Sequence, residues 1–478
     1  MTAMLPTWEG MRGDTGATVS LEGRYEEPFE IPDFIKNVTL DGKGESEISV
    51  KGTCALICIA CDVTMRGMKI STEGEDEGVT VGRGGRLTLE GCTIRSTKGT
   101  GIKVNGGNVL LKGCTIEGCG EYGIFVVEGG SVRCEECKVV KNAKSGVLAR
   151  GSGSNLSLVR SEVASNGGNG IGCDEGGSFT ASLSSISRNR QIGVNIGDFS
   201  TGSIEECELD ENSMHGVAMK KSTLAVSSSS IKKSGKLGIF LTPTTDGDKT
   251  AYAKFSDVTI ADSGVHGIFM LGGVVESCGL EITGSGESGI VSKAGKLSLT
   301  KVMIGHNKMD GIAILDAGDG QGGCESEVRE ASVVRNGRFG VSAMGSCSCR
   351  LLKVKVESSG DGSGDGGHGV AALKGALVSV TECRIAHNKK CGVLVHGASP
   401  GGRASGVNLK KSVVQDNSLF GASAAEGGRL LISSSSFVRN TLGEVEGDYR
   451  VERGTLLPVL TVAAVSVLLY VFLRKSRT

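Results

Sequence analysis

Cysteine is the residue with the most obvious capacity for chemistry in this sequence, which contains 16 cysteines among 478 residues. Cys54, Cys58 and Cys61 lie close together, as do Cys134 and Cys137, and thiolates at such spacings can bind zinc. On a β-strand, however, residues three apart point to opposite faces, which makes tetrahedral coordination awkward. We therefore predict neither a metal site nor a cofactor for this chain.

Other cysteines recur at one fixed position of a repeating pattern, where serine replaces them elsewhere. The cysteines are Cys92, Cys114, Cys137, Cys207 and Cys383, and the serines are Ser161, Ser184, Ser229, Ser412 and Ser435. A small side chain at an interior corner of a repeat explains both residue types without a metal. Successive cysteines of this series could come close enough for a disulfide, but the cytosolic location argued below disfavours one.

A short acidic segment and three histidines are further candidates. Residues 361–366 match the first half of a calcium-binding loop, but Ala372 stands where such a loop needs a bidentate glutamate. We interpret this segment as a flexible acidic insertion. His215, His266 and His368 fall in well-separated repeats, too far apart to share a metal ion.

The secondary structure that must position these residues can be inferred from the glycines. The sequence contains 76 glycines but only 6 prolines. This ratio excludes collagen, which needs abundant proline, and disfavours helical bundles, because glycine is costly inside helices. Fifteen glycines, each followed by a small or branched apolar residue, recur every 22 to 24 residues, with four longer units of 29: Gly78, Gly101, Gly123, Gly146, Gly170, Gly193, Gly216, Gly238, Gly267, Gly289, Gly311, Gly340, Gly369, Gly392 and Gly421.

Each repeat contains three short runs of alternating apolar residues. In one unit these runs are residues 101–104, 109–111 and 114–116, with the Gly106-Gly107 pair as the turn after the first run. Three short strands cannot bury their apolar faces alone, but stacking each unit on the next buries them. The pattern predicts an all-β parallel solenoid of about 15 or more coils. The rival leucine-rich repeat lacks its leucine and asparagine consensus here.

A column of asparagines supports the same alignment of repeats. Asparagine, which suits left-handed turn conformations, stands four residues before the glycine at Asn142, Asn166, Asn189, Asn212, Asn307, Asn336, Asn388 and Asn417, and Asn440 continues the series. Serine takes the position at Ser234, Ser263 and Ser285. We expect these amides to align as a hydrogen-bonded ladder along the stacked coils.

With these motifs in place, the sequence resembles the right-handed parallel β-helix superfamily, the pectin-lyase-like fold, and most closely the NosD-like and CASH-type repeats. Residues 19–25, 29–31 and 38–42 look like the opening coils of such helices. The resemblance covers residues 15–443 and implies a right-handed β-helix there. The residues outside this region are an N-terminal segment (1–14), a linker (444–455), an apolar segment (456–473) and a basic tail (474–478).

The apolar segment predicts a membrane anchor. Residues 456–473 are 18 uncharged, mostly apolar residues, which as a helix would span about 27 Å, close to the thickness of the hydrocarbon core. Arg474, Lys475 and Arg477 follow as a basic flank. No signal peptide is visible at the N-terminus. We therefore expect a tail-anchored protein with its body in the cytosol, favouring the mitochondrial outer membrane, with peroxisome, endoplasmic reticulum and plastid envelope as alternatives.

The sequence shows no catalytic residues. A net charge of −1 disfavours nucleic acid as a partner. The Gly367-His368-Gly369 element looks like one of polygalacturonases, but their other motifs are missing, and we find no column of aspartate or glutamate. We predict a non-enzymatic, membrane-tethered scaffold that binds other proteins along its face or loops. The alternative is a carbohydrate-binding or carbohydrate-active β-helix, with a glycan as partner.

Loop insertions are the remaining candidates for binding. Three of the four longer repeats carry their extra residues after the first strand, at 242–250, 316–323 and 397–405. Because three coils separate successive insertions, we expect them along one edge, roughly 14 Å apart. Tolerated insertion without function is the other interpretation. The fourth extension, 358–367, falls at a different turn.

Overall fold

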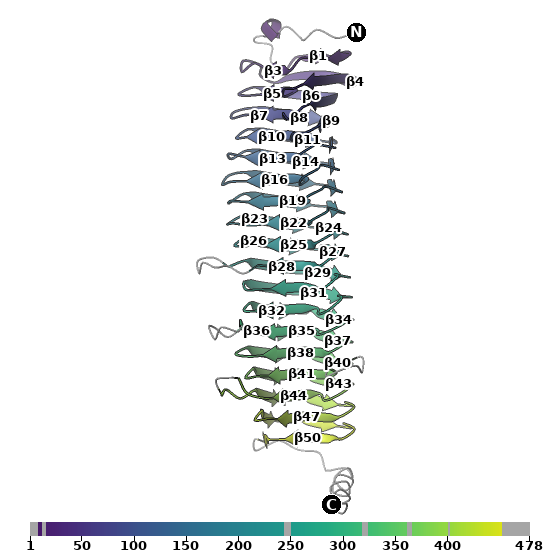
Figure 1. Ribbon diagram of the computed structural model, residues 1–478, viewed down its shortest axis with the longest axis vertical. Coiled ribbons are helices and arrows are strands. Elements are labelled where there is room, and N and C mark those ends of the chain that lie inside the picture. Colours follow the sequence, from purple (N-terminus) through teal and green to yellow (C-terminus); the bar gives the residue numbers. More distant parts are fainter. Residues whose placement is uncertain are drawn as a thin grey trace, which may run out of the picture. The chain divides into compact units, whose positions relative to one another are not determined.

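The computed structural model describes residues 8–11, 16–242, 250–317, 324–360, 366–399 and 402–451. These residues form an all-β parallel solenoid of about 18 coils, which confirms the predicted fold class (Figure 1). The helical element of this described part is a single 3-10 turn, η1 (Trp8–Met11). The chain divides into two compact units, Met1–Lys254 and Phe255–Thr478, which are described separately.

Each coil contributes strands to two sheets, called here the first and the second sheet. In the first unit, the first sheet contains β3 (Phe29–Ile31), β5 (Leu56–Cys58), β7 (Val79–Val81), β10 (Ile102–Asn105), β13 (Ile124–Val127), β16 (Val147–Arg150), β19 (Ile171–Asp174), β22 (Val194–Ile196), β25 (His215–Met219) and β28 (Leu237–Leu241).

The second sheet receives the second and third strands of each coil. Its first-unit strands are β1 (Thr18–Ser20), β2 (Arg24–Tyr25), β4 (Val38–Lys51), β6 (Asp62–Glu73), β8 (Arg86–Glu90), β9 (Thr93–Ser96), β11 (Asn108–Lys112), β12 (Thr115–Glu117), β14 (Ser131–Glu135), β15 (Lys138–Val140), β17 (Asn155–Val159), β18 (Glu162–Ala164), β20 (Ser178–Ser182), β21 (Ser185–Ser187), β23 (Thr201–Glu205), β24 (Glu208–Asp210), β26 (Thr223–Ser227) and β27 (Ser230–Lys232). Strand β29 (Tyr252–Ala261) contains the boundary between the units.

The second unit repeats this arrangement. Its first sheet contains β30 (Ile268–Met270), β32 (Ile290–Lys293), β35 (Ile312–Leu315), β38 (Phe339–Met344), β41 (His368–Leu373), β44 (Val393–His396), β47 (Phe420–Ala425) and β50 (Gly443–Gly447). Its second sheet contains β31 (Val274–Thr283), β33 (Lys296–Thr300), β34 (Met303–Gly305), β36 (Glu325–Arg329), β37 (Ser332–Val334), β39 (Ser348–Leu352), β40 (Lys355–Glu357), β42 (Leu377–Thr381), β43 (Arg384–Ala386), β45 (Gly406–Lys410), β46 (Val413–Gln415), β48 (Arg429–Ser433), β49 (Ser436–Val438) and β51 (Tyr449–Val451).

The core consists of like side chains stacked from coil to coil. In the first sheet Ile102 pairs with Ile124, and Ile124 pairs with Val147, all in parallel register and fully buried. Alternate residues of each strand face outward, as in β11, where Val109 and Leu111 are buried between exposed or half-buried neighbours. Burial of such a column removes apolar surface from water along the whole unit, which explains how short strands become stable.

The solenoid extends further than the sequence predicted. We expected it to end at residue 443 and a linker to follow, but β50 and β51 form one more coil that pairs with β47 and β48. The sequence hides this coil because Glu444 stands where the other coils have the repeat glycine, as the pairing of Phe420 with Gly443 and of Ala422 with Val445 shows.

The predicted membrane anchor cannot be placed on this fold. The part of the chain that the structure describes contains no helix long and apolar enough to cross a bilayer. The predicted span, 456–473, and its basic flank Arg474, Lys475 and Arg477 lie outside the described residues.

Candidate functional site

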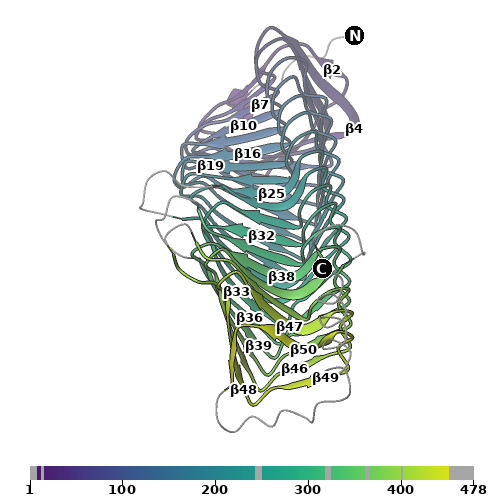
Figure 2. The same ribbon diagram turned by 60° about the horizontal axis from the view of Figure 1, so that its bottom comes forward.

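A groove of about 1230 Å³ lies on the outer face of the second sheet in the second unit. Its floor comes from the outward residues of β33, β36, β39, β42, β45 and β48. The strands β33, β36 and β39 lie side by side in Figure 2. Because residues alternate between the two faces of a strand, the core packs behind this floor while polar side chains line it.

Strand register places the polar side chains of the floor in a single row. Ser298 pairs with Glu327, Glu327 with Arg350, Arg350 with Ser379, and Ser379 with Asn408. Neighbours in such a row are separated by about 4.8 Å, the spacing of hydrogen-bonded strands. The row therefore presents hydroxyl, carboxylate, guanidinium and amide groups at regular intervals along the groove.

Glu327 is the carboxylate at the centre of a charged cluster. Its Oε2 accepts from Arg329 at 2.8 Å and its Oε1 from Arg350 at 3.4 Å. The Arg329 guanidinium, with a smaller contribution from Arg350, lowers the pKa of Glu327 below its ordinary value. Glu327 is thus ionised at neutral pH and remains available to accept hydrogen bonds from hydroxyl groups.

Further cations line the groove. Among the described residues, no carboxylate lies within ion-pair distance of Lys296, Arg403, Arg429 or Arg450. A guanidinium offers several N–H donors in a fixed plane, which suits ligands rich in oxygen. These side chains supply the groove with positively charged hydrogen-bond donors.

One predicted insertion forms part of the groove rim. In the segment 397–405, Ala398 and Ala404 make an antiparallel bridge, and Ser399 N donates to Arg403 O at 2.8 Å. The Ser405 hydroxyl accepts from Gly375 N at 2.8 Å and donates to His396 O at 3.0 Å, which fastens the segment to the neighbouring coil. The insertions 242–250 and 316–323 fall largely outside the described residues, so their alignment along one edge stays a prediction.

The asparagine column lies inside the solenoid. In the first unit Asn142, Asn166, Asn189 and Asn212 are buried, and each Nδ2 of the first three donates to the next Oδ1 at 3.0 Å. In the second unit the same contact joins Asn307 to Asn336, Asn388 to Asn417, and Asn417 to Asn440. These residues stabilise the fold and do not line the groove.

The sequence profile described as "Right handed beta helix region" matches residues 33–163, 169–248 and 245–442. The match covers most of the chain. The chain belongs to the right-handed β-helix family. No curated protein matches this β-helix chain significantly in sequence.

Solved structures with a similar fold include three carbohydrate-active proteins. Pectate lyase Pel9A has 11% identity and a TM-score of 0.40, with 60% of this chain and 73% of that chain covered. The periplasmic alginate epimerase AlgG has 12% identity and a TM-score of 0.31, with 81% and 78% covered. The A-module of the Azotobacter vinelandii mannuronan C-5 epimerase AlgE6 has 13% identity and a TM-score of 0.22, with 95% and 94% covered. At these identities the likeness shows the fold alone.

The prediction that this β-helix protein is not an enzyme must be corrected. It rested on missing polygalacturonase motifs and on the lack of a column of aspartate or glutamate, but a carboxylate with two nearby cations is also a catalytic arrangement, and Glu327 with Arg329 and Arg350 forms one. The prediction is therefore withdrawn. The cluster escaped notice because its members come from two coils, separated by 23 residues, and meet only through strand register.

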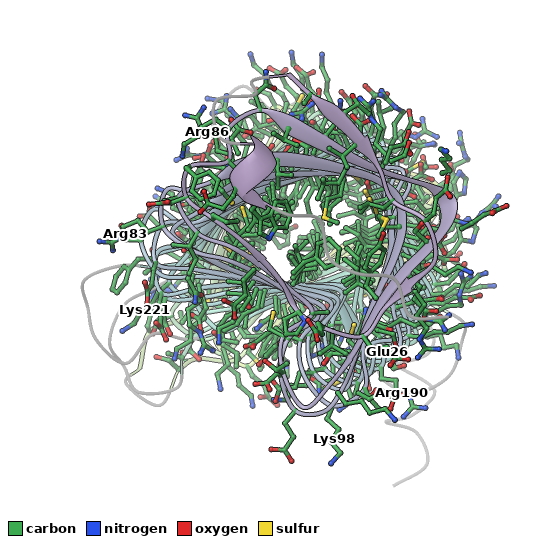
Figure 3. All side chains as sticks on the ribbon, turned by 90° about the horizontal axis from the view of Figure 1, so that it is seen from above. Glu26, Arg83, Arg86, Lys98, Arg190 and Lys221 are labelled. Carbon is green, nitrogen blue, oxygen red and sulfur yellow. The ribbon has the colours of Figure 1, made fainter. Side chains whose placement is uncertain are left out.

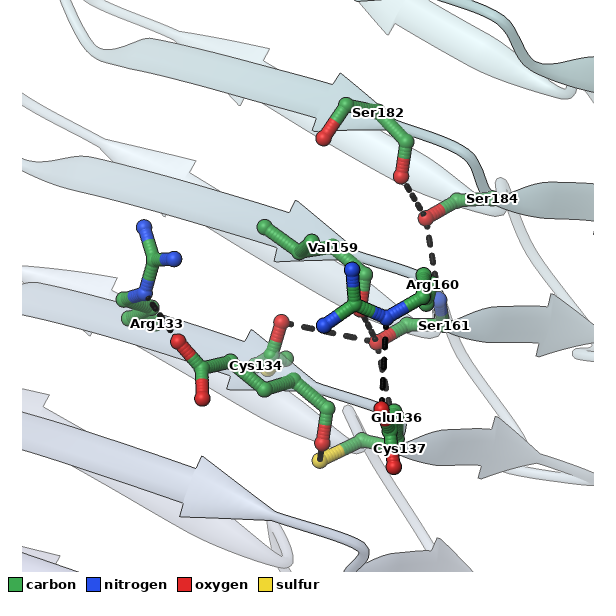
Figure 4. A network of polar contacts seen from close by, with 10 residues as sticks. Arg133, Cys134, Glu136, Cys137, Val159, Arg160, Ser161, Ser182 and Ser184 are labelled. Atoms are coloured by element: carbon green, nitrogen blue, oxygen red, sulfur yellow. Dashed lines mark hydrogen bonds and ion pairs between the residues drawn. The ribbon is translucent and has the colours of Figure 1, made fainter.

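Fifteen of the 16 cysteines of the β-helix are buried. All 16 thiols are free, and no group of metal-ligating side chains that could hold an ion occurs among the described residues. At the shared repeat position, the Ser161 hydroxyl accepts from Cys137 N at 3.1 Å, and the Ser184 hydroxyl accepts from Ser161 N at 3.0 Å (Figure 4). Cysteine and serine are equivalent here because both are small enough for the corner and can donate to the carbonyl two residues earlier.

The histidine and calcium-loop candidates lie away from the groove floor. His368 is buried, accepts from Cys391 N through Nδ1 at 3.2 Å, and stacks on Phe339 with ring centroids 5.8 Å apart. Residues 361–365 of the acidic segment lie outside the described residues, and Ala372 is buried in the core. Neither feature shares a side chain with the groove.

Proposed function

We propose that this protein is a carbohydrate-binding or carbohydrate-active β-helix whose glycan lies in the groove of the second unit. The observation that carries the proposal is the row Ser298, Glu327, Arg350, Ser379 and Asn408, which repeats polar groups at strand spacing in a groove that Lys296, Arg403, Arg429 and Arg450 also line. A sugar chain is a repeating array of hydroxyl groups, so a repeating array of donors and acceptors complements it.

The described surface favours this proposal over a protein-binding scaffold. The core of a protein interface is usually rich in aromatic and apolar side chains. Here the large exposed apolar residues, among them Ile59, Leu183 and Met303, are scattered along the chain. Two others, Leu377 and Tyr449, line the groove, where they lie among charged and polar side chains from successive coils.

Replacing Arg350 by alanine should weaken glycan binding about tenfold, the effect expected from losing one charged hydrogen-bond donor. A glycan array of neutral and acidic oligosaccharides, probed with the full-length chain, identifies the ligand, and titration gives the affinities. Arg384→Ala is the matched control, because Arg384 pairs with Glu357 on another strand as Arg350 pairs with Glu327. Binding to no glycan, or equal losses in both variants, would contradict the proposal.

The affinity should also stay constant as the pH falls from 8 to about 5. Arg329 and Arg350 lower the pKa of Glu327, so its carboxylate stays ionised below the pH at which an isolated glutamate takes up a proton. Binding should weaken only as the pH falls through this depressed pKa. A loss of affinity already between pH 7 and pH 5 would argue against a role for ionised Glu327.

We further propose that residues 456–473 tether the protein to a membrane facing the cytosol, on the strength of their length and apolar composition. Alkaline extraction of organelles should leave the full-length chain in the membrane and release a chain that ends at Gly454. Protease added to intact organelles should digest the body of the protein. Complete protection from protease would refute the cytosolic orientation.

A further inference from the structure

The turn between β22 and β23 contains a phenylalanine in a backbone conformation that normally favours glycine. Asp198 and Phe199 both have positive φ, 35° and 67°. The same two-residue turn recurs in other coils, where the second residue is Gly129, Gly176, Gly375 or Gly427. A bulky side chain is disfavoured at positive φ because its Cβ crowds the backbone, so Phe199 occupies this position at a cost that glycine avoids.

The ring of Phe199 does not recover this cost by burial in the core. Its side chain is 55% exposed. The backbone around it is nevertheless well fixed: Phe199 N donates to Lys221 O at 2.8 Å, and Ser200 N donates to Gly197 O at 3.0 Å. Backbone strain that the surroundings hold in place is typical of ligand-binding positions.

A small hollow of about 430 Å³ lies beside this ring. Thr201 and Thr223, which pair in register on adjacent strands, line it together with Thr250, and Lys221 borders it on the outside of the solenoid (Figure 3). An exposed aromatic ring next to a row of hydroxyls matches the two surfaces of a sugar: C–H groups on the faces of the ring and hydroxyls at its edge.

We propose that Phe199 is a stacking platform for a pyranose ring, and that the Thr201 and Thr223 hydroxyls bind the hydroxyls of the same sugar. The ligand class is a β-linked hexose chain whose ring substituents are equatorial, because such a ring presents only C–H groups to the aromatic face. The inference rests on the proposed carbohydrate function, but it places a second contact in the first unit, independent of the groove.

The test uses the full-length chain with tryptophan as a reporter. The sequence contains a single tryptophan, Trp8, so the double variant Trp8→Phe, Phe199→Trp carries one fluorophore at the platform. Titration with cellohexaose should change its emission in a saturable way. In calorimetry, Phe199→Gly should weaken cellohexaose binding by roughly threefold to tenfold, while its Tm should rise by about 2 °C because the strain is relieved.

Leu183→Gly is the matched control. Leu183 is also an apolar residue at positive φ, 52°, and is 49% exposed, but it does not line the hollow. This variant should gain stability in the same way and keep its affinity for cellohexaose. Equal affinities of the wild type and Phe199→Gly, or no change in emission, would overturn the platform. If the emission changes while Arg350→Ala leaves all glycan binding intact, the groove proposal fails and the platform stands.

Discussion

Replacing Gly170 by valine should destabilise the solenoid by about 3 kcal/mol or more, the upper range for overpacking a dense interior. A Cβ built on Gly170 would lie 2.6 Å from Cγ2 of Ile186, 2.7 Å from Nδ2 of Asn189 and 2.7 Å from the carbonyl oxygen of Gly193. The Asn189 Nδ2 belongs to the asparagine ladder, and the Gly193 carbonyl belongs to the backbone of the next coil. Neither atom can move without displacing the coils stacked on it.

Gly113→Ala provides the control for this prediction. Gly113 has a positive φ of 57°, but a Cβ there would meet no atom within 4 Å. Its substitution should therefore cost only about 1 kcal/mol, the price of the left-handed conformation. Chemical denaturation followed by circular dichroism compares the two variants. If Gly170→Val proved as stable as Gly113→Ala, close packing would not explain the repeat glycines.

The repeat glycines show why so much of this fold could be predicted from sequence. Each lies where one coil approaches the next, and the requirement is local, so it recurs with the length of a coil and becomes visible as a period. Gly123 and Gly146 meet the same obstacles as Gly170, an asparagine Nδ2 and a glycine carbonyl of the next coil. A constraint repeated along the chain needs no knowledge of distant contacts.

The groove could not be predicted in the same way. Glu327 and Arg350 belong to repeats of the same length, 29 residues, but the extra residues fall at different turns, 316–323 in the first repeat and 358–367 in the second, so equal length does not align their second strands. The repeat glycines fix where the first strand of each coil begins. They do not fix the register of the second strand when an insertion lies between the first and second strands. Aligning the second strands separately would have revealed the row from Ser298 to Asn408.

Phe199 was missed for a different reason. Its significance lies in its positive φ, and a phenylalanine in the sequence gives no sign of its backbone conformation. The surrounding repeats do contain the signal, since Gly129 and Gly176 hold the equivalent position. An aromatic residue at a position otherwise held by glycine is the departure from the pattern that sequence reasoning should look for in a regular solenoid.

Replacing Asn189 by leucine should lower the free energy of unfolding by about 3 kcal/mol or more, because several buried polar groups would lose their partners at once. The Asn189 amide makes four hydrogen bonds. Its Oδ1 accepts from the backbone N of Asn166 at 3.1 Å and from Asn166 Nδ2 at 3.0 Å. Its Nδ2 donates to Val163 O at 3.1 Å and to Asn212 Oδ1 at 3.0 Å. Leucine has the same branching and the same number of side-chain heavy atoms but bulkier methyl groups, so the variant removes these bonds without leaving a cavity.

The serines of the column provide a control in which the free energy of unfolding should change in the opposite direction. The hydroxyls of Ser234, Ser263 and Ser285 are buried and have no hydrogen-bond partner among the described residues, because the serine side chain is too short to reach the next coil. Ser285→Asn should restore the contact to Asn307 Oδ1, which already accepts from Ser285 N at 3.0 Å, and should stabilise the chain by about 1 kcal/mol. If the denaturation midpoint falls in Asn189→Leu and rises in Ser285→Asn, the hydrogen bonds of the ladder account for the change in stability. If both variants lose stability, side-chain volume at the ladder position matters more than its hydrogen bonds.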